Sequence, residues 1–218
     1  LIKKARENGA KIILIDPIRN ESAKFCDHHY APKPGGDGYL ALAICKYLLE
    51  EDKADVEFLK NATLNAEAIE RMSQRFSWEQ LSVGCGLSEE TLREIAMLFS
   101  QNHPATICMG RGPQHYKQGA EITRLILAAC ALSGNLGVKG GGYNYNSDFW
   151  GPFDRTLDGG EFATSHRTAP KAIIGEAILN MKEPPIRAAY IHGGNPVTQC
   201  PNSQKVARAF CSIDFVTV

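Results

Sequence analysis

Residues 11–22 read KIILIDPIRNES and give the first strand signal of the chain. Its first five residues are a short apolar run, mostly β-branched, with Gly9 before it and Asp16-Pro17 directly after it. Such a run is typical of a strand that is buried on both faces of a parallel sheet. Ligands of open parallel sheets bind beyond the carboxyl ends of the strands, so the residues that follow this strand are candidates for a binding site.

Similar units follow along the chain. Strands are predicted at 28–31, 105–109, 186–191 and 215–218, and helices at 37–49, 121–130, 173–181 and 203–210. The stretch 55–101 is predicted to be helical, with Ser88 as an N-cap and Leu92, Ile95 and Ala96 on one stripe. Residues 133–165 are rich in Gly, Asn and aromatic residues and are predicted to be an irregular loop that is poorly ordered in the isolated chain.

Alternating strands and helices predict an α/β fold of the Rossmann-like kind. We expect a doubly wound, mainly parallel sheet with helices on both faces, in which 11–15, 105–109 and 186–191 are neighbouring central strands. The whole chain, 1–218, is expected to form one domain, with 55–101 as a helical insertion.

Composition excludes several classes of function. The 24 Lys and Arg residues balance the 24 Asp and Glu residues, which argues against binding to nucleic acid or to an anionic membrane surface. No apolar run approaches the roughly 20 residues of a membrane span, so direct membrane insertion is not expected. The seven cysteines include no C-x-x-C pair, which argues against a zinc ribbon or an iron–sulfur site here and leaves the compartment open.

The opening residues point to a longer parent protein. The chain starts with Leu1, and residues 1–9 resemble the last turns of a helix that stops at Gly9. We therefore expect the chain to be a piece cut from a longer protein.

Two charged residues near the first strand are candidate ligand contacts. Asp16 ends the strand, where an acidic side chain can accept hydrogen bonds from a ribose diol, but it can equally cap the following turn. Arg19 can pair with a phosphate, although a solvated surface arginine is the more common finding.

Later loops offer a second set of candidates. Asp37 follows two glycines and can present its carboxylate to the paired N–H donors of a guanine edge, but spacing alone favours a helix N-cap. Gln114 and His115 stand in the glycine-containing loop GRGPQH, and as isolated residues they are better explained as structural. No G-x-S-x-G, P-loop, H-E-x-x-H or G-x-G-x-x-G motif is found, and the adjacent His28 and His29 do not make a metal site.

Taken together, four segments resemble the molybdopterin oxidoreductase family, which includes formate dehydrogenases, periplasmic nitrate reductases and dimethyl sulfoxide reductase. They are NGAKIILIDPIRNESAKFCDHHYAPKPGGDGYLALAICKYLLEE (8–51), GLSEETLREIAMLFS (86–100), MGRGPQHYKQGAEITRLILAACALSGNLGVKGGG (109–142) and AAYIHGGNPVTQCPNSQKVARAF (188–210). Their order also matches the family. The sequence departs from the family pattern at Asn20 and Ser22, where Thr is usual, and at Gly36, where Thr or Ser is usual.

The resemblance implies a role in cofactor binding. In this family two pterin dinucleotides hold one molybdenum or tungsten, and the matching domain binds the guanosine diphosphate end of a molybdopterin guanine dinucleotide. By matching position, Asp16 would bind ribose hydroxyls, Arg19 and Ser22 would flank the phosphates and Asp37 would bind the guanine. The pterin and pyrophosphate path would be lined by Gly110, Gly112, Gln114, Gly193 and Asn195.

The resemblance also implies what the rest of the parent enzyme supplies. The metal ligand, any iron–sulfur cluster and a further cofactor-binding domain are expected elsewhere in the parent chain, and an electron-transfer iron–sulfur subunit is a possible partner. The parent is expected to be an oxidoreductase, whereas this piece alone is expected to be inactive. Its substrate and the choice of molybdenum or tungsten stay open.

Two alternatives remain. The chain could be a non-catalytic scaffold domain, like the large iron–sulfur subunit of respiratory complex I. It could also be another nucleotide-binding module that uses NAD or thiamine diphosphate, although the missing glycine fingerprint argues against this.

Overall fold

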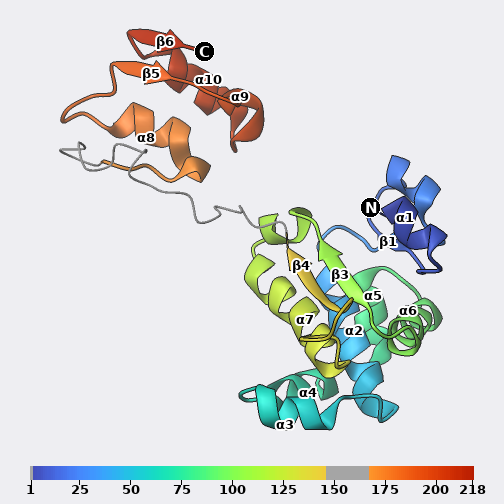
Figure 1. Ribbon diagram of the computed structural model, residues 1–218. Coiled ribbons are helices and arrows are strands. Elements are labelled where there is room, and N and C mark those ends of the chain that lie inside the picture. Colours follow the sequence, from blue (N-terminus) through green and yellow to red (C-terminus); the bar gives the residue numbers. More distant parts are fainter. Residues whose placement is uncertain (1, 146–166) are drawn as a thin grey trace. The chain divides into compact units, whose positions relative to one another are not determined.

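A computed structural model of the chain describes residues 2–145 and 167–218 (Figure 1). Its contacts divide the chain into two compact units, Leu1–Phe149 and Trp150–Val218. We call them the N-terminal unit and the C-terminal unit and describe each by itself. A single domain over 1–218 therefore stays a prediction.

The N-terminal unit alternates short strands with longer helices. Its described elements are α1 (Ile2–Glu7), β1 (Ile13–Ile15), the 3-10 helix η1 (Glu21–Phe25), β2 (His28–Tyr30), α2 (Asp37–Glu50), α3 (Val56–Ala62), α4 (Glu67–Gln74), α5 (Trp78–Cys85), α6 (Glu89–Gln101), β3 (Thr106–Met109), the 3-10 helix η2 (Gly112–His115), α7 (Gly119–Leu132) and β4 (Gly142–Tyr145). Four helices thus occupy the predicted helical stretch. Asp55, Ser77 and Ser88 accept hydrogen bonds at the starts of α3, α5 and α6, so local capping sets these boundaries.

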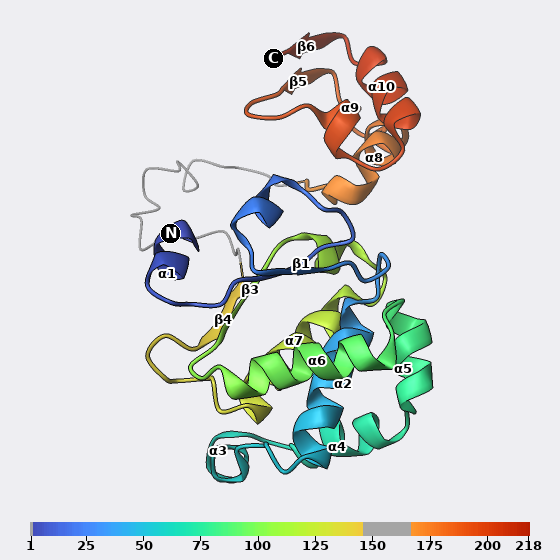
Figure 2. The ribbon, with the colours of Figure 1, turned by 90° about the vertical axis from the view of Figure 1, so that its right-hand side faces the viewer.

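Helix α2 is the centre of the N-terminal unit. It packs against α4, α5, α6 and α7, and Figures 1 and 2 show these helices gathered around it. The fully buried leucines of this core are Leu42 and Leu48 of α2, Leu81 of α5, Leu92 of α6 and Leu132 of α7. Burying one such side chain contributes roughly 1.5–3 kcal/mol, so this cluster is the main support for the strands and loops around it.

The C-terminal unit repeats the strand–helix–strand pattern on a smaller scale. Its elements are the 3-10 helix η5 (Lys171–Ile173), α8 (Ile174–Asn180), β5 (Ala188–Tyr190), α9 (Pro196–Gln199), α10 (Ser203–Cys211) and β6 (Phe215–Thr217). Strands β5 and β6 pair in parallel, and α8 packs on α10 (Figure 2). A Cβ atom at Gly175 would lie 3.0 Å from the backbone of Val206, so a glycine permits this close helix contact. The predicted crossover in this region is confirmed.

Parallel strands and helices confirm the α/β class, but the predicted single sheet is wrong. The described residues form three separate two-stranded parallel sheets, β1 with β2, β3 with β4, and β5 with β6. Within the N-terminal unit, the runs 11–15 and 105–109 are therefore not hydrogen-bonded neighbours. Each run contributes only three or four residues to its strand. Each strand pairs with the next strand along the chain. Burial of 11–15 on both faces is also wrong, since Ile15 is 38% exposed.

The predicted irregular loop 133–165 is partly corrected. Gly142–Tyr145 is the strand β4, which pairs with β3 along its whole length, and Tyr143 and Tyr145 are partly buried. The strand was not predicted because glycine is depleted in strands, so a Gly-rich stretch indicates a loop. The part of that stretch from residue 146 to residue 165, with its aromatic residues Phe149, Trp150 and Phe153, lies outside the described residues.

Asn135 explains how the chain turns from α7 into β4. Its side chain is fully buried, its Oδ1 accepts from the Ala105 backbone N–H at 2.7 Å, and its Nδ2 donates to Ser133 Oγ at 2.8 Å. A Cβ atom at Gly141 would lie 2.5 Å from the Asn135 carbonyl oxygen. The GNLGVKGGG segment therefore joins the end of α7 to the starts of β3 and β4, which is a structural role.

Among the described residues, no helix combines the length and apolar character needed to cross a membrane.

Candidate functional site

Asp16 stands at the carboxyl end of β1 and is held in place by its neighbours. Its carboxylate accepts from the Ile18 backbone N–H at 2.8 Å and from Asn20 Nδ2 at 3.0 Å. His29 Nε2 donates to the Asp16 carbonyl oxygen at 2.9 Å. The turn-capping alternative thus describes part of its role. A carboxylate has about four acceptor positions, so these two bonds leave a half-buried, oriented Asp16 able to accept from a ligand.

The segment after Asp16 is exposed. Asn20 accepts from the Ser22 backbone N–H at 2.9 Å and so caps η1, which shows why an amide can stand where the family usually has Thr. Arg19 and Ser22 are both exposed. Their side chains are accessible to a ligand, and their proposed contacts to phosphate stay predictions.

Asp37 is the first residue of α2 and does not cap it. Gly36 occupies the N-cap position, and the helix start has no side-chain capping bond, so the N-cap favoured by spacing is wrong. Burial raises the pKa of the Asp37 carboxyl, its own backbone N–H lowers it, and the negative charge of Asp16 raises it further. Asp16 and Asp37 are 21 positions apart in sequence, but in the folded chain they lie close enough for the charge of Asp16 to affect the pKa of Asp37.

The glycines before Asp37 fix the turn that presents it. A Cβ atom at Gly36 would lie 2.7 Å from the Cys85 carbonyl oxygen and 2.9 Å from the Lys33 carbonyl oxygen. The Lys33 backbone N–H also donates to the Cys85 carbonyl at 2.8 Å. The turn is thus clamped to the end of α5, and the glycine at this departure from the family pattern is required by close backbone packing. Gly35 has a φ of +82°, which favours glycine.

The loop between β3 and α7 lies beside this turn. Gly38 of α2 approaches Ile122 of α7, where an added Cβ atom would meet the Ile122 side chain at 3.2 Å. The two helices therefore begin close together, and neither has a side-chain cap at its N-terminus. At Gly110 and Gly112 an added Cβ atom would have no other atom within 4 Å. These two glycines thus line open space rather than a packed turn.

Two tyrosines near this loop are not among the predicted site residues. The Tyr145 hydroxyl, at the end of β4, donates to Gln114 Oε1, which ties the β3–α7 loop to the neighbouring strand end. The ring of Tyr116 lies against Gly35. Tyr116 directly follows the GRGPQH loop, so an aromatic residue next to a glycine-containing loop is the signal that could have found it.

The remaining predicted site residues belong to the C-terminal unit. Gly193 has a φ of +68° and open space around its missing side chain, so it can let a ligand approach the backbone. Asn195 Oδ1 accepts from the Val197 backbone N–H at 3.1 Å, which makes it the N-cap of α9. Its ligand contact stays a prediction, and its structural role is shown.

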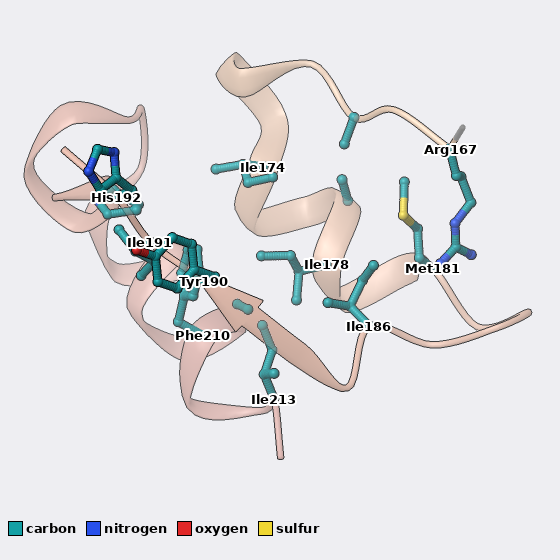
Figure 3. A pocket seen from close by; sticks show the side chains of 14 residues that line it. Arg167, Ile174, Ile178, Met181, Ile186, Tyr190, Ile191, His192, Phe210 and Ile213 are labelled. Atoms are coloured by element: carbon teal, nitrogen blue, oxygen red, sulfur yellow. The ribbon is translucent and has the colours of Figure 1, made fainter. Parts of the chain in front are cut away.

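The C-terminal unit also contains a hollow of about 460 Å³ next to this loop. Figure 3 shows isoleucine side chains across its middle, with His192 toward one end and Arg167 and Met181 toward the other. Its lining is mainly apolar and includes Ile174, Ile178, Ile186, Phe210 and Ile213.

Metal-binding side chains do not gather in the described part of the chain. Within 2–145 and 167–218 no group of three His, Cys, Asp or Glu residues is placed to hold a metal ion. The seven cysteines are free thiols, and His28 stacks on Tyr30 while His29 contacts Asp16. The candidate site of this chain is therefore a set of hydrogen-bonding side chains and open glycines.

Comparison with known proteins gives a consistent picture. The profile of the family described as molybdopterin oxidoreductase matches residues 1–218. The chain is 36% identical to the probable oxidoreductase YyaE of Bacillus subtilis over 211 residues, which is 96% of the chain and 32% of that protein. It is 27% identical to formate dehydrogenase H of Escherichia coli, covering 98% of the chain and 33% of that protein.

Two further comparisons extend the range of relatives. Trimethylamine-N-oxide reductase of Haemophilus influenzae is 25% identical over 99% of the chain and 30% of that protein. The solved structure of acetylene hydratase from Pelobacter acetylenicus is similar with a TM-score of 0.57 at 24% identity, over 61% of this chain and 18% of that one, which concerns the fold alone. The chain spans about a third of the length of the curated relatives named here.

Proposed function

Because the chain belongs to the molybdopterin oxidoreductase family, we propose that it binds the guanine dinucleotide part of a molybdopterin cofactor in a larger molybdenum or tungsten oxidoreductase. The observation that carries the proposal is a set of two half-buried carboxylates, Asp16 at the carboxyl end of β1 and Asp37 at the start of α2, close enough that the charge of Asp16 raises the pKa of the Asp37 carboxyl. Asp37 is not used as a helix cap. Two oriented acceptors at this edge suit the hydroxyl and N–H donors of a guanosine.

The proposed contacts follow from the positions of these two carboxylates. Asp37 accepts from the N1 and N2 groups of guanine, and Asp16 accepts from the ribose hydroxyls. Arg19 and Ser22 flank the phosphates from the exposed segment after β1. The uncapped N-termini of α2 and α7 add backbone N–H groups, which favour a diphosphate.

Other residues make room for the cofactor rather than bind it through side chains. Gly110 and Gly112 border open space in the N-terminal unit, and Gly193 does so in the C-terminal unit. Gln114, held by Tyr145, and Asn195 present polar groups beside these openings. We call the opening at Gly110 and Gly112 in the N-terminal unit the cradle; it would suit a flat pterin and its pyrophosphate, which approach the backbone closely.

The division of labour in the whole protein is part of the proposal. When bound, the cofactor supplies the metal-centred redox chemistry, while the residues of this chain bind and orient it. The metal ligand, an iron–sulfur cluster and contacts to other domains or to an electron-transfer iron–sulfur subunit are proposed for the rest of the parent protein. The chain alone is proposed to be inactive, and the differing substrates in the names of its relatives leave the substrate open.

Changing Gly112 to Ala tests the proposed cradle. We expect the variant to fold with an unchanged melting temperature, because the added methyl group meets no atom within 4 Å and the residue has no left-handed φ. We expect its molybdopterin content to fall, because the methyl group enters the space proposed for the cofactor. The measurement is pterin and metal content per purified full-length protein, with Asn61→Ala, an exposed change in α3, as the control. Equal cofactor content in both variants would place the cofactor away from Gly112.

A further inference from the structure

Tyr116 lies in contact with the turn that presents Asp37. The Tyr116 carbonyl accepts from the Gly119 backbone N–H at 2.9 Å, which holds the residue in the tight turn before α7. Its ring atoms lie 3.6 to 3.9 Å from the position that a Cβ atom at Gly35 would occupy. The side chain is nevertheless 37% exposed, so part of the ring faces outward.

Asp37 comes two positions after Gly35, the residue that the Tyr116 ring contacts. Only Gly36 separates Gly35 from Asp37, so the Cα atoms of Gly35 and Asp37 lie at most about 7 Å apart. The turn between them is rigid, because Gly36 is buried against the Cys85 and Lys33 carbonyl oxygens. An exposed aromatic ring and a half-buried carboxylate therefore flank the same closely packed turn of the N-terminal unit.

We propose that Tyr116 is a base-binding residue of this site, whose ring stacks on the purine while Asp37 accepts from the edge of that purine. This inference rests on the function proposed above and adds to it the surface that holds the base. Every base has a face that can stack on an aromatic ring, so Tyr116 contributes affinity for any purine. The carboxylate of Asp37 then selects guanine, whose N1 and N2 groups are adjacent donors.

The alternative role for Tyr116 is purely structural, as a cover over Gly35. A cover would stabilise the loop whatever base is present, and its loss would weaken every ligand of the site equally. A stacking surface acts on the base alone. Binding of a nucleotide and of inorganic diphosphate by the same variants therefore separates the two roles.

The experiment uses the full-length protein, purified from cells that cannot make molybdopterin, and measures binding of GDP, ADP and inorganic diphosphate by titration calorimetry. The variants are Tyr116→Leu, which removes the aromatic face, Tyr116→Phe, which keeps it, and Asp37→Asn. We expect Tyr116→Leu to bind GDP and ADP about tenfold more weakly, with diphosphate binding unchanged. Tyr116→Phe stays within about twofold of the wild type.

The outcomes separate this inference from the proposed function. If Asp37→Asn loses the preference for GDP over ADP but Tyr116→Leu binds GDP like the wild type, stacking is wrong and the guanine site stands. If Tyr116→Leu loses diphosphate binding to the same extent, Tyr116 is a structural cover and the inference is overturned. If the wild-type protein shows no preference for GDP over ADP, the proposed guanine contact fails, whereas the stacking inference is still decided by whether Tyr116→Leu binds both nucleotides more weakly.

Discussion

Asp37→Asn is expected to remove most of the guanine dinucleotide from the full-length protein. The ionised carboxylate can accept from two adjacent donors of guanine, and each hydrogen bond to a charged group contributes about 1.5–3 kcal/mol. The amide has one oxygen acceptor, and its NH₂ group opposes the second donor. The measurement is guanine nucleotide released per purified protein, with Glu51→Gln, an exposed change at the other end of α2, as the control.

The melting temperature of Asp37→Asn is expected to stay the same or to rise. Burial raises the pKa of the Asp37 carboxyl in the folded protein, and the charge of Asp16 raises it further. The ionised form therefore costs folding stability at every pH above the folded pKa, and this cost disappears below the unfolded pKa. A neutral side chain at 37 removes that cost. A clear fall in melting temperature, or an unchanged nucleotide content, would contradict a ligand-binding role.

Gly36→Ala is expected to lower the free energy of unfolding of the chain by about 2–3 kcal/mol. The new Cβ atom would lie 2.7 Å and 2.9 Å from two backbone carbonyl oxygens, so the turn or the end of α5 must move. Urea unfolding followed by circular dichroism gives the difference, with Gly112→Ala as the matched control because it adds the same methyl group in open space. Equal unfolding midpoints for the two variants would show that the turn before Asp37 is not closely packed.

The sequence predicted the helices well, because their signals are local. Ser88 caps α6 as expected, and Leu92, Ile95 and Ala96 form its buried stripe. The spacing of apolar residues along a helix and its capping residues involve positions only a few residues apart, so these signals can be recognised without knowing the tertiary structure. The α/β class followed from the alternation of these helices with short apolar runs.

Strand partners and packing were harder to predict, because they depend on residues far apart in the sequence. Gly142–Tyr145 forms a strand only because Asn135 and the end of α7 direct it alongside β3. In the same way, the side chain of Asp37 looked like a cap from its spacing, whereas close packing of Gly36 against Cys85 starts the helix one residue earlier.

Sequence analysis predicted the charged residues of the candidate site but not its aromatic residues. Asp16 and Asp37 follow strands at recognisable positions, but their proximity appears only in the folded chain. Tyr116 stands beside a glycine-containing loop, which is a local signal, but its contact with Gly35 joins two loops 81 positions apart in sequence and appears only in the folded chain.

The nucleotide carried by the full-length protein tests the central proposal most directly. The protein is purified from cells that make the cofactor, treated with acid, and analysed for released nucleotides together with molybdenum and tungsten. The proposal predicts GMP as the released nucleotide, with molybdenum or tungsten present in the same preparation. A preparation that contains neither GMP nor metal would contradict it and favour a scaffold domain without cofactor, and release of an adenine nucleotide alone would favour a different nucleotide-binding module.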